Sequence, residues 1–363
     1  MRFLLATDAW HPQINGVVRT LTHLVAELRR AGHEVLVVSP ADFRTLPCPT
    51  YPEIRLSLTT PRRLARRIRS FAPDVVHVAT EGPIGLSARA AALRLDLPLT
   101  TSFHTRFPEY LRRRAPVPER LTYALLRRFH APAAACLVPT AQVRRELAAR
   151  GFARLVTWTR GVDRALFRPR SGVDLGLKAP VFLCVGRVAP EKGLEAFLDL
   201  DLPGSKLVVG GGPALAALKA RYPDVRFVGS KVGEELVDLY NAADVFVFPS
   251  RTDTFGIVLL EALACGVPVA AFPEPGPIEV LAETGAGVLD EDLRAACLKA
   301  LTLDPADALG RSEAFTWAAC AERFVEVAAL ALANHPVATA QPSVARRISA
   351  RLFTRPKHQP PGM

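Results

Sequence analysis

The sequence contains no apolar run of eighteen or more residues and no closely spaced pair of cysteines. The first absence excludes a membrane-spanning helix. The six cysteines are scattered without a C-x-x-C pair, so neither a zinc site nor a disulfide framework is indicated. Most of them lie in apolar segments, which is typical of reduced thiols in a core. Met1–Ala6 is too short for the apolar part of a signal peptide, so we expect a cytosolic protein.

Lysine is absent from the first 165 residues, where 26 arginines accompany 12 acidic residues. Residues 166–340 are acidic, with 15 basic and 23 acidic side chains, and the last 23 residues hold five basic side chains and no acidic one. A basic first half and a basic tail indicate an anionic partner: a membrane surface, a nucleic acid or a phosphorylated substrate. The basic segments contain no interleaved aromatic residues and no known nucleic-acid-binding module, which argues against nucleic acid.

The length of 363 residues, 49% of them hydrophobic, predicts two domains of ordinary size. Apolar runs alternate with segments of helical periodicity in both halves, which predicts an α/β protein with two parallel sheets. We expect the chain to divide as follows: a first domain over 1–167, a linker over 168–179, a second domain over 180–311, a long helix over 312–335 and a disordered basic tail over 336–363.

A strand, a loop, a helix and a second strand are predicted in close succession in the second half. Val245–Phe248 and Val267–Phe272 have the composition of buried parallel strands, and Ile257–Cys265 has apolar residues at helical spacing up to Gly266. The loop Ser250–Gly256 therefore follows the carboxyl end of a strand. Open α/β sheets bind ligands at that edge.

Two carboxylates fall on this loop and helix. Asp253 lies in the loop, and Glu261 lies on the loop side of an otherwise apolar helix. Carboxylates suit sugar hydroxyls, and the N–H groups at a helix N-terminus suit a phosphate. The structural alternative is that Asp253 caps the helix and Glu261 caps a neighbouring loop.

Polar residues at other predicted strand ends point to the same crevice. Asn15 and Gly16 precede a helix predicted over Val17–Ala31. The segment lacks the G-x-G-x-x-G pattern of dinucleotide-binding loops. Gly16 either lets the backbone approach a phosphate closely or makes an ordinary turn. His104 follows the predicted strand Leu97–Ser102, and this position favours a functional role over a purely structural hydrogen bond.

Two cations follow the first predicted strand of the second domain, Val181–Gly186. Arg187 and Lys192 lie where this strand passes into a helix, as binding of a diphosphate requires. Asp199-Leu200-Asp201 has the form of a metal-binding D-x-D motif, but it lies between a helix and the next strand. We interpret it as structural and expect no catalytic metal.

The segment Arg62–Phe71 is a basic helix whose Leu64, Ile68 and Phe71 share one face. Its composition is typical of a helix at an anionic membrane surface. The same pattern fits a solvated surface helix that docks on the domain through its apolar stripe, and we favour this second interpretation.

Taken together, these motifs resemble the family-4 glycosyltransferases. The resemblance covers residues 1 to about 333 and rests on three segments: Asp253-x7-Glu261 with Phe255-Gly256 inside it, Gly186-Arg187 with Glu191-Lys192-Gly193, and Pro12–Val17. It implies the GT-B fold, in which two doubly wound Rossmann-like domains enclose a cleft. The last helix, Ser312–Ala333, would then cross back onto the first domain.

The resemblance implies catalytic roles for His104, Arg187, Lys192, Asp253 and Glu261. Arg187 and Lys192 would hold the diphosphate, and Glu261 would bind the ribose hydroxyls. Asp253 would hold the transferred sugar, and His104 would contact that sugar near its reacting carbon. Asp253 stands where the family more often has Glu, and its shorter reach leaves the identity of the sugar open.

Seven residues are implied in donor binding by the same resemblance: Asn15, Gly16, Gly186, Val232, Thr254, Phe255 and Gly256. The segment near Val232 would contact the base, and the backbone of Thr254–Gly256 would hold the sugar. Gly16 would approach the phosphate from the first domain. The family is retaining and metal-independent, so we expect neither a cofactor nor a metal.

Within the family, four phrases resemble bacterial enzymes that glycosylate diacylglycerol from UDP-sugars: Asp8–Gln13, Phe43–Thr45, Pro49–Arg55 and Ser102–Phe107. The predicted partners are a nucleotide-sugar donor, a lipid acceptor and the anionic inner face of the cytoplasmic membrane. The alternative is a GDP-mannose-dependent α-mannosyltransferase acting on a lipid or glycan, and a more remote one is a non-catalytic protein that binds membranes or nucleic acid.

Overall fold

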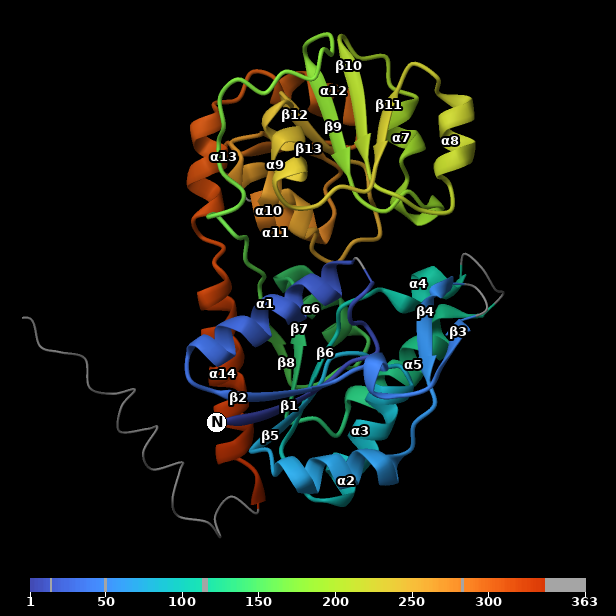
Figure 1. Ribbon diagram of the computed structural model, residues 1–363, viewed down its shortest axis with the longest axis vertical. Coiled ribbons are helices and arrows are strands. Elements are labelled where there is room, and N and C mark those ends of the chain that lie inside the picture. Colours follow the sequence, from blue (N-terminus) through green and yellow to red (C-terminus); the bar gives the residue numbers. More distant parts are fainter. Residues whose placement is uncertain (14, 49–50, 113–116, 282–283, 337–363) are drawn as a thin grey trace, which may run out of the picture.

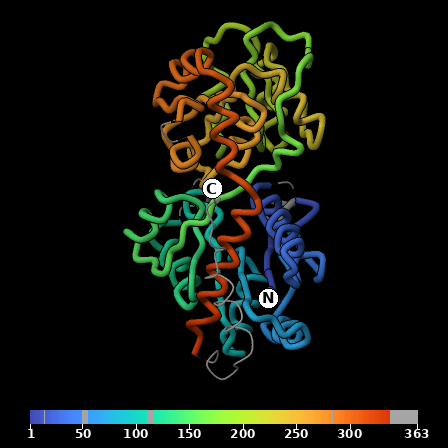
Figure 2. The backbone as a smooth tube through the Cα atoms, turned by 90° about the vertical axis from the view of Figure 1, so that its left-hand side faces the viewer, coloured from blue at the N-terminus to red at the C-terminus, as the bar shows by residue number. Residues whose placement is uncertain are grey.

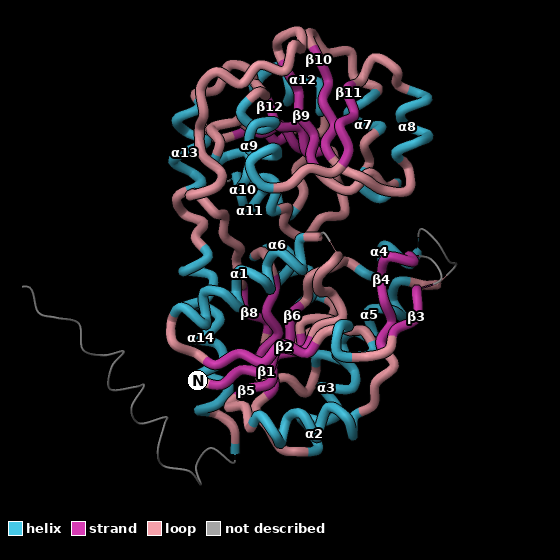
Figure 3. The backbone as a smooth tube through the Cα atoms, viewed as in Figure 1, coloured by secondary structure: helices cyan, strands magenta, loops and turns pink. Residues whose placement is uncertain are grey.

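A computed structural model of the chain describes residues 1–13, 15–48, 51–112, 117–281 and 284–336. It contains two six-stranded sheets, one in each half of the chain, and a separate two-stranded hairpin. Figure 1 shows the two halves as separate lobes, and Figure 3 shows helices on both sides of each sheet. The predicted α/β class with two doubly wound domains is confirmed. The basic tail, from residue 337 on, lies outside the described residues.

The first sheet has the strand order β2-β1-β5-β6-β7-β8 and is parallel throughout. Its strands are β1 (Arg2–Ala6), β2 (Glu34–Val38), β5 (Val75–Val78), β6 (Leu99–Ser102), β7 (Ala135–Val138) and β8 (Leu155–Thr157). The connecting helices are α1 (Gly16–Arg30), η1 (Pro40–Asp42), α2 (Pro61–Phe71), α3 (Pro83–Arg94), α4 (Phe107–Arg112), α5 (Glu119–His130) and α6 (Ala141–Ala149). The hairpin of β3 (Thr45–Cys48) and β4 (Tyr51–Ser57) was not predicted.

The second sheet is also parallel throughout, with the order β11-β10-β9-β12-β13-β14. Its strands are β9 (Val181–Val185), β10 (Ser205–Val209), β11 (Arg226–Gly229), β12 (Val245–Phe248), β13 (Val269–Ala271) and β14 (Gly287–Leu289). Its helices are η2 (Pro190–Lys192), α7 (Glu195–Leu198), α8 (Leu215–Arg221), α9 (Gly233–Asn241), α10 (Ile257–Ala264), α11 (Pro275–Leu281), α12 (Leu293–Ala300) and α13 (Pro305–Ser312). In each sheet the chain first adds strands on one side of its first strand, β1 or β9, and then crosses to the other side. Such a switch point forms a ligand crevice at the carboxyl edge.

Alternate residues of β1 pack on opposite faces of the first sheet, as the pleat requires. Phe3 and Leu5 belong to the cluster formed with α1, whereas Leu4 and Ala6 belong to the cluster formed with α2 and α3. Burial on both faces explains why these strands are continuous apolar runs in the sequence. Five cysteines are buried in such clusters, as predicted: Cys136, Cys184, Cys265, Cys297 and Cys320.

The final helix, α14 (Trp317–Ala333), packs on the first domain rather than the second. Phe324 lies in the cluster that contains Phe3, and Figure 2 shows the helix running down along the first lobe. The prediction of one helix starting at Ser312 is wrong, because Ser312 ends α13. Thr316 is extended and its hydroxyl accepts a hydrogen bond from Ala319 N (3.1 Å), so a new helix begins there.

The apolar stripe of α2 is docked on the domain. Leu64 and Ile68 are buried in the same cluster as Val76, while Arg62 and Arg66 are exposed. The stripe therefore has no free face to insert into a bilayer, and the favoured interpretation of a surface helix docked through its apolar stripe is confirmed. The same periodicity is satisfied by packing on the protein.

His77 makes the stability of the first domain depend on pH. It is fully buried on β5 between the hydroxyls of Thr100 (3.0 Å from Nδ1) and Ser102 (2.8 Å from Nε2), and burial lowers its pKa to about 3. Between pH 6.5 and about 3, His77 is protonated in the unfolded chain and neutral in the folded chain. The free energy of unfolding should therefore fall by about 1.4 kcal/mol per pH unit as the pH drops from 6.5 toward 3.

As the pH falls from 6.5 to 4, the free energy of unfolding should fall less steeply in His77→Gln than in the wild type. The two slopes should differ by the value for one proton, about 1.4 kcal/mol per pH unit. Urea unfolding at a series of pH values measures it. Equal slopes for the two proteins would contradict the assignment. Above pH 6.5 both forms of the chain carry neutral histidine here, so no difference in slope is expected there.

Candidate active site

Figure 1 shows the two lobes one above the other, and the loops after the carboxyl ends of β6 and β12 meet at the junction between them, where residues of both domains line a cleft. Hydrogen bonds cross it from Arg19 Nη1 to Glu261 Oε1, from Thr254 Oγ1 to the carbonyl oxygen of His104 (2.7 Å) and from Ala141 N to Glu279 Oε2 (2.8 Å). The start of α1 also lies against the start of α10, since a Cβ on Gly16 would be 3.8 Å from Ile257 Cδ1. The structure thus brings His104, Gly16, Thr254 and Glu261 to one place.

The loop before α10 has a fixed conformation that requires glycine. Gly256 caps α10 with a positive φ of 89°, and a Cβ there would be 2.9 Å from Phe248 Cζ. Phe255 is buried in the core, so it anchors the backbone on the other side of Thr254. The N–H groups of the first turn of α10 therefore start from a rigid loop at the cleft, where they can bind an anion.

Lys192 and Asp253 form an ion pair between the loops that follow β9 and β12. Each side chain is 21% exposed, so the pair is accessible from the cleft. The hydroxyl of Thr252 donates to the carbonyl oxygen of Glu191 (2.9 Å) and ties the same two loops together. Arg187 is half-buried in the first of these loops. A cation and a carboxylate that were predicted to serve one donor are thus direct neighbours.

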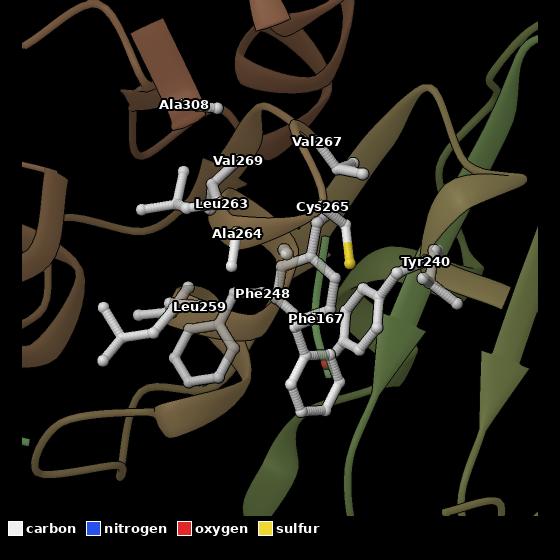
Figure 4. Close-up of a cluster of buried hydrophobic side chains, with 14 of the residues drawn as sticks. Phe167, Tyr240, Phe248, Leu259, Leu263, Ala264, Cys265, Val267, Val269 and Ala308 are labelled. Atoms are coloured by element: carbon white, nitrogen blue, oxygen red, sulfur yellow. The ribbon is translucent and has the colours of Figure 1, made fainter. Parts of the chain in front are cut away.

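Glu261 is 2% exposed, and each of its carboxylate oxygens accepts a hydrogen bond. Oε1 accepts from Arg19 of the first domain, and Oε2 accepts from the hydroxyl of Tyr240 on α9 (2.9 Å). Figure 4 shows the Tyr240 ring beside Phe167 in the core of the second domain. Burial raises the pKa of Tyr240 well above its ordinary value, so its hydroxyl stays a donor.

His104 is oriented by a buried arginine. Arg160 donates to His104 Nδ1 (3.2 Å) and to the carbonyl oxygens of Trp158 (2.6 Å) and Thr159 (3.1 Å). Because a guanidinium has only donors, Nδ1 must be the acceptor, and the proton of the neutral ring lies on Nε2. That Nε2 is enclosed and has no hydrogen-bond partner within the described part of the chain.

The charge on His104 follows from the same surroundings. Burial, and then the nearby Arg160, lower the pKa of His104 well below 6.5. The ring is therefore neutral at ordinary assay pH and carries one N–H, on the enclosed Nε2, to which no group of the described residues is hydrogen-bonded. Such a group can donate a hydrogen bond to a substrate oxygen, but it is a poor general base.

A cavity of about 80 Å³ lies beside Glu261. Both domains and the chain segment between them contribute to its wall, which includes Arg19, His23, Asp163, Ile257, Glu261 and Trp317. His23 stacks on Trp317 with ring centroids 4.5 Å apart. The carboxylate thus borders a small space of mixed polar and apolar lining at the junction of the two domains.

The remaining predicted donor-binding residues lie on the rim or have local structural roles. Asn15 Oδ1 accepts from Val18 N (3.0 Å) and caps α1, and Gly186 directly follows β9. Val232 is 57% exposed at the start of α9. Asp199 of the D-x-D motif accepts from the Tyr222 hydroxyl (2.5 Å), consistent with a structural role.

Three residues of this site were not predicted from the sequence: Arg19, Arg160 and Tyr240. Arg19 lies one helical turn after Gly16, and a cation beside a predicted phosphate loop is a signal that could have identified it. Tyr240 follows the apolar periodicity of α9 and has the pattern of a core residue. Arg160 has no local signal, because its contact with His104 joins segments 56 residues apart.

Family models match most of the chain. Residues 14–166 match the model described as Glycosyltransferase Family 4, and residues 170–300 match the model described as Glycosyl transferases group 1.

No helix within the described residues is long and apolar enough to cross a membrane.

Three similar proteins are named for the transfer of different sugars. The GDP-mannose-dependent alpha-mannosyltransferase of Mycobacterium tuberculosis is 31% identical over 80% of this chain and 83% of its own length. The sulfoquinovosyl transferase SQD2 of Arabidopsis thaliana is 31% identical over 76% of this chain and 60% of its own length. The alpha-monoglucosyldiacylglycerol synthase of Streptococcus pneumoniae is 27% identical over 84% of this chain and 79% of its own length.

Solved structures of glycosyltransferases share the fold. Sucrose-phosphate synthase from Thermosynechococcus elongatus has a TM-score of 0.71 at 21% identity and covers 90% of this chain and 97% of its own. Anabaena HepE, solved with UDP and glucose, has a TM-score of 0.67 at 16% identity and covers 90% and 98%. With the two matched domains and the two facing Rossmann-like sheets, the chain belongs to the family-4 glycosyltransferases of GT-B fold and is a hexosyltransferase.

Proposed function

We propose that this enzyme transfers a hexose, with retention, from a UDP-sugar to diacylglycerol or a similar lipid at an anionic membrane surface. The observation that carries the proposal is the meeting, in one interdomain cleft, of buried Glu261, the Lys192–Asp253 pair and the N–H of His104 Nε2. Acceptors for sugar hydroxyls, a cation for a diphosphate and a neutral donor for a sugar oxygen together fit a nucleotide-sugar. The names of the pneumococcal and Acholeplasma laidlawii relatives state synthesis of monoglucosyldiacylglycerol.

Each residue has a distinct task in this proposal. Glu261 accepts from the ribose hydroxyls, while Arg187 and Lys192 bind the diphosphate. Asp253 accepts from a hydroxyl of the transferred sugar, and His104 donates to that sugar near its anomeric carbon. The backbone N–H groups after Gly256 add positive potential at the same diphosphate.

The proposed reaction is a front-face displacement. The acceptor hydroxyl oxygen forms a bond to the anomeric carbon on the face that the diphosphate leaves, and the bond between that carbon and the phosphate oxygen breaks. The electron pair goes to the phosphate oxygen, which takes the acceptor's proton. Because negative charge develops on the diphosphate, Lys192 and Arg187 bind the transition state more strongly than the ground state.

GDP-mannose is the second candidate donor. It is favoured by the mycobacterial mannosyltransferase, whose name states that donor and which is 31% identical. The two donors share ribose, diphosphate and hexose, so the residues discussed above serve either one. Recognition of the base, which we assign to the segment around Val232, decides between them.

Turnover with three donors tests the proposal. The purified protein is given diacylglycerol in anionic vesicles with UDP-glucose, UDP-glucuronate or GDP-mannose, with a chelator in place of added metal. We expect glycolipid from a UDP-sugar. Glycolipid formed only from GDP-mannose would identify GDP-mannose as the donor. Donor hydrolysis without glycolipid would show that diacylglycerol is not the acceptor.

The first domain has an exposed face that suits an anionic bilayer. On α5 the exposed positions are occupied by arginine, leucine and alanine, and Leu121 and Leu125, one turn apart, are 54% and 62% exposed. Arg120, Arg127 and Arg128 lie on the same exposed side. Leucines that enter the interface, with arginines at the headgroups, give reversible binding to anionic lipid. We propose this face, rather than α2, as the membrane contact.

We expect Leu121→Ser combined with Leu125→Ser to weaken binding to anionic vesicles by about tenfold or more, since each leucine contributes about 1.5–3 kcal/mol when fully buried. Vesicle sedimentation measures the loss. The matched control is Leu330→Ser, because Leu330 is 60% exposed on α14, on the opposite side of the lobe in Figure 1. Equal binding by the double variant and the control would contradict the proposed face.

A further inference from the structure

Arg19 is a cation of the first domain that reaches the donor side of the cleft. It lies on α1, one turn after Gly16, and its Nη1 donates to Glu261 Oε1 on α10. The Arg19 side chain is 30% exposed and the Glu261 side chain 2% exposed, so water and salt screen this ion pair little. Neither the sequence motifs nor the tasks proposed above give Arg19 a role.

The hydrogen-bonding capacity of Glu261 shows what this contact permits. A carboxylate has about four acceptor sites, two on each oxygen. Arg19 occupies one site on Oε1 and Tyr240 occupies one on Oε2, which leaves one site on each oxygen. Two adjacent ribose hydroxyls need two such sites. Arg19 and a ribose can therefore bind Glu261 at the same time.

We propose that Arg19 is a positioning residue that closes the first domain onto the donor-bound second domain through Glu261. This inference rests on the proposed function, because it takes Glu261 to be the ribose-binding carboxylate. Tyr240 and Glu261 both belong to the second domain, so Arg19 is the group that makes this carboxylate a bridge between domains. Donor binding and domain closure then depend on one side chain.

Closure matters for the reaction because the reacting groups come from both domains. His104 belongs to the first domain, while Lys192 and Asp253 belong to the second. The side chains proposed to bind the donor's ribose and diphosphate, Glu261, Arg187 and Lys192, all belong to the second domain, so nucleotide affinity does not require Arg19. Bringing His104 and the acceptor to the anomeric carbon does require it.

Arg19→Met tests this inference, since methionine keeps most of the side-chain length without the charge. We expect kcat to fall by about 10- to 100-fold, the usual range for coupling between sites, while the Kd for UDP or GDP changes by less than about threefold. Arg19→Lys should recover part of kcat, because it restores a cation. The control is Arg30→Met on the same helix, whose side chain is 70% exposed and pairs with Glu27.

Small-angle scattering gives a readout that a merely stabilising role would not change. We expect the wild type to become more compact with UDP or GDP and Arg19→Met to remain extended with the nucleotide bound. Tighter nucleotide binding by Arg19→Met would overturn the inference, because Arg19 would then compete with the ribose. If Arg19→Met has the kcat and the compaction of the wild type, the inference about Arg19 is overturned and the proposed function stands. If the wild type binds neither UDP nor GDP, the inference and the proposed function are both overturned.

Discussion

Glu261→Gln should lower kcat/KM for the nucleotide-sugar by about 10²- to 10³-fold, since hydrogen bonds to a charged group contribute about 1.5–3 kcal/mol each and two ribose hydroxyls lose a charged acceptor. Glutamine keeps the shape of the side chain. It has one acceptor oxygen in place of two, so it cannot serve Arg19, Tyr240 and the ribose together. Initial rates over a range of donor concentrations, with calorimetric titration of UDP and GDP, measure the change.

The matched control for this variant is Glu326→Gln. Glu326 lies on α14, its side chain is 54% exposed, and it pairs with Arg323 on the surface. We expect this control to have the activity of the wild type, because exposed ion pairs contribute about 1 kcal/mol or less. Full activity of Glu261→Gln would show that Glu261 does not bind the donor. If the variant is inactive but still binds vesicles, its defect is not in the membrane contact.

Lys192→Ala should lower kcat by about 10²- to 10³-fold, the usual cost of removing one group that stabilises developing negative charge. In the proposed reaction that charge develops on the departing diphosphate. The variant also leaves the Asp253 carboxylate without its ion-pair partner, so Asp253 must hold the sugar without an orienting contact. Steady-state kinetics should show a larger change in kcat than in KM, because the interaction strengthens as the charge develops.

Lys219→Ala provides the control for Lys192→Ala. Lys219 is exposed on α8 of the same domain. We expect its removal to leave kcat unchanged, which would show that the charge at position 192, rather than the net charge of the domain, is responsible. An equal fall in both variants, or wild-type kcat in Lys192→Ala, would contradict the role proposed for Lys192.

The positions of His104 and Arg19 explain why a closed cleft is needed for these effects. Arg160 fixes His104 with its Nε2 proton directed away from the bond at Nδ1, and burial keeps the ring neutral. The ring can then act as a hydrogen-bond donor over the whole physiological pH range. It belongs to the first domain, so its distance from Asp253 is set by closure, which we assign to Arg19 and Glu261.

Local sequence patterns determined much of the fold and part of the site. The strand Val245–Phe248 and the start of α10 at Ile257 were predicted with the boundaries found. Asp253 and Glu261 were predicted to lie on the loop and the helix that follow this strand, and the structure places them there. Their binding of one donor stays a prediction. Inferences about position succeed when the interacting residues are close in the chain, since backbone geometry then limits where each side chain can go.

Tertiary structure alone decided the features that depend on how separate elements pack. The pattern of α2 fits a helix on a membrane as well as one on a domain, and only the burial of Leu64 and Ile68 distinguishes them. Arg19 and Glu261 are 242 residues apart, and their bond exists because two independently formed domains meet at one angle. Hydrophobic periodicity predicts which face of a helix or strand is buried. It does not predict which other element packs on that face, or which residue a polar side chain beside it contacts.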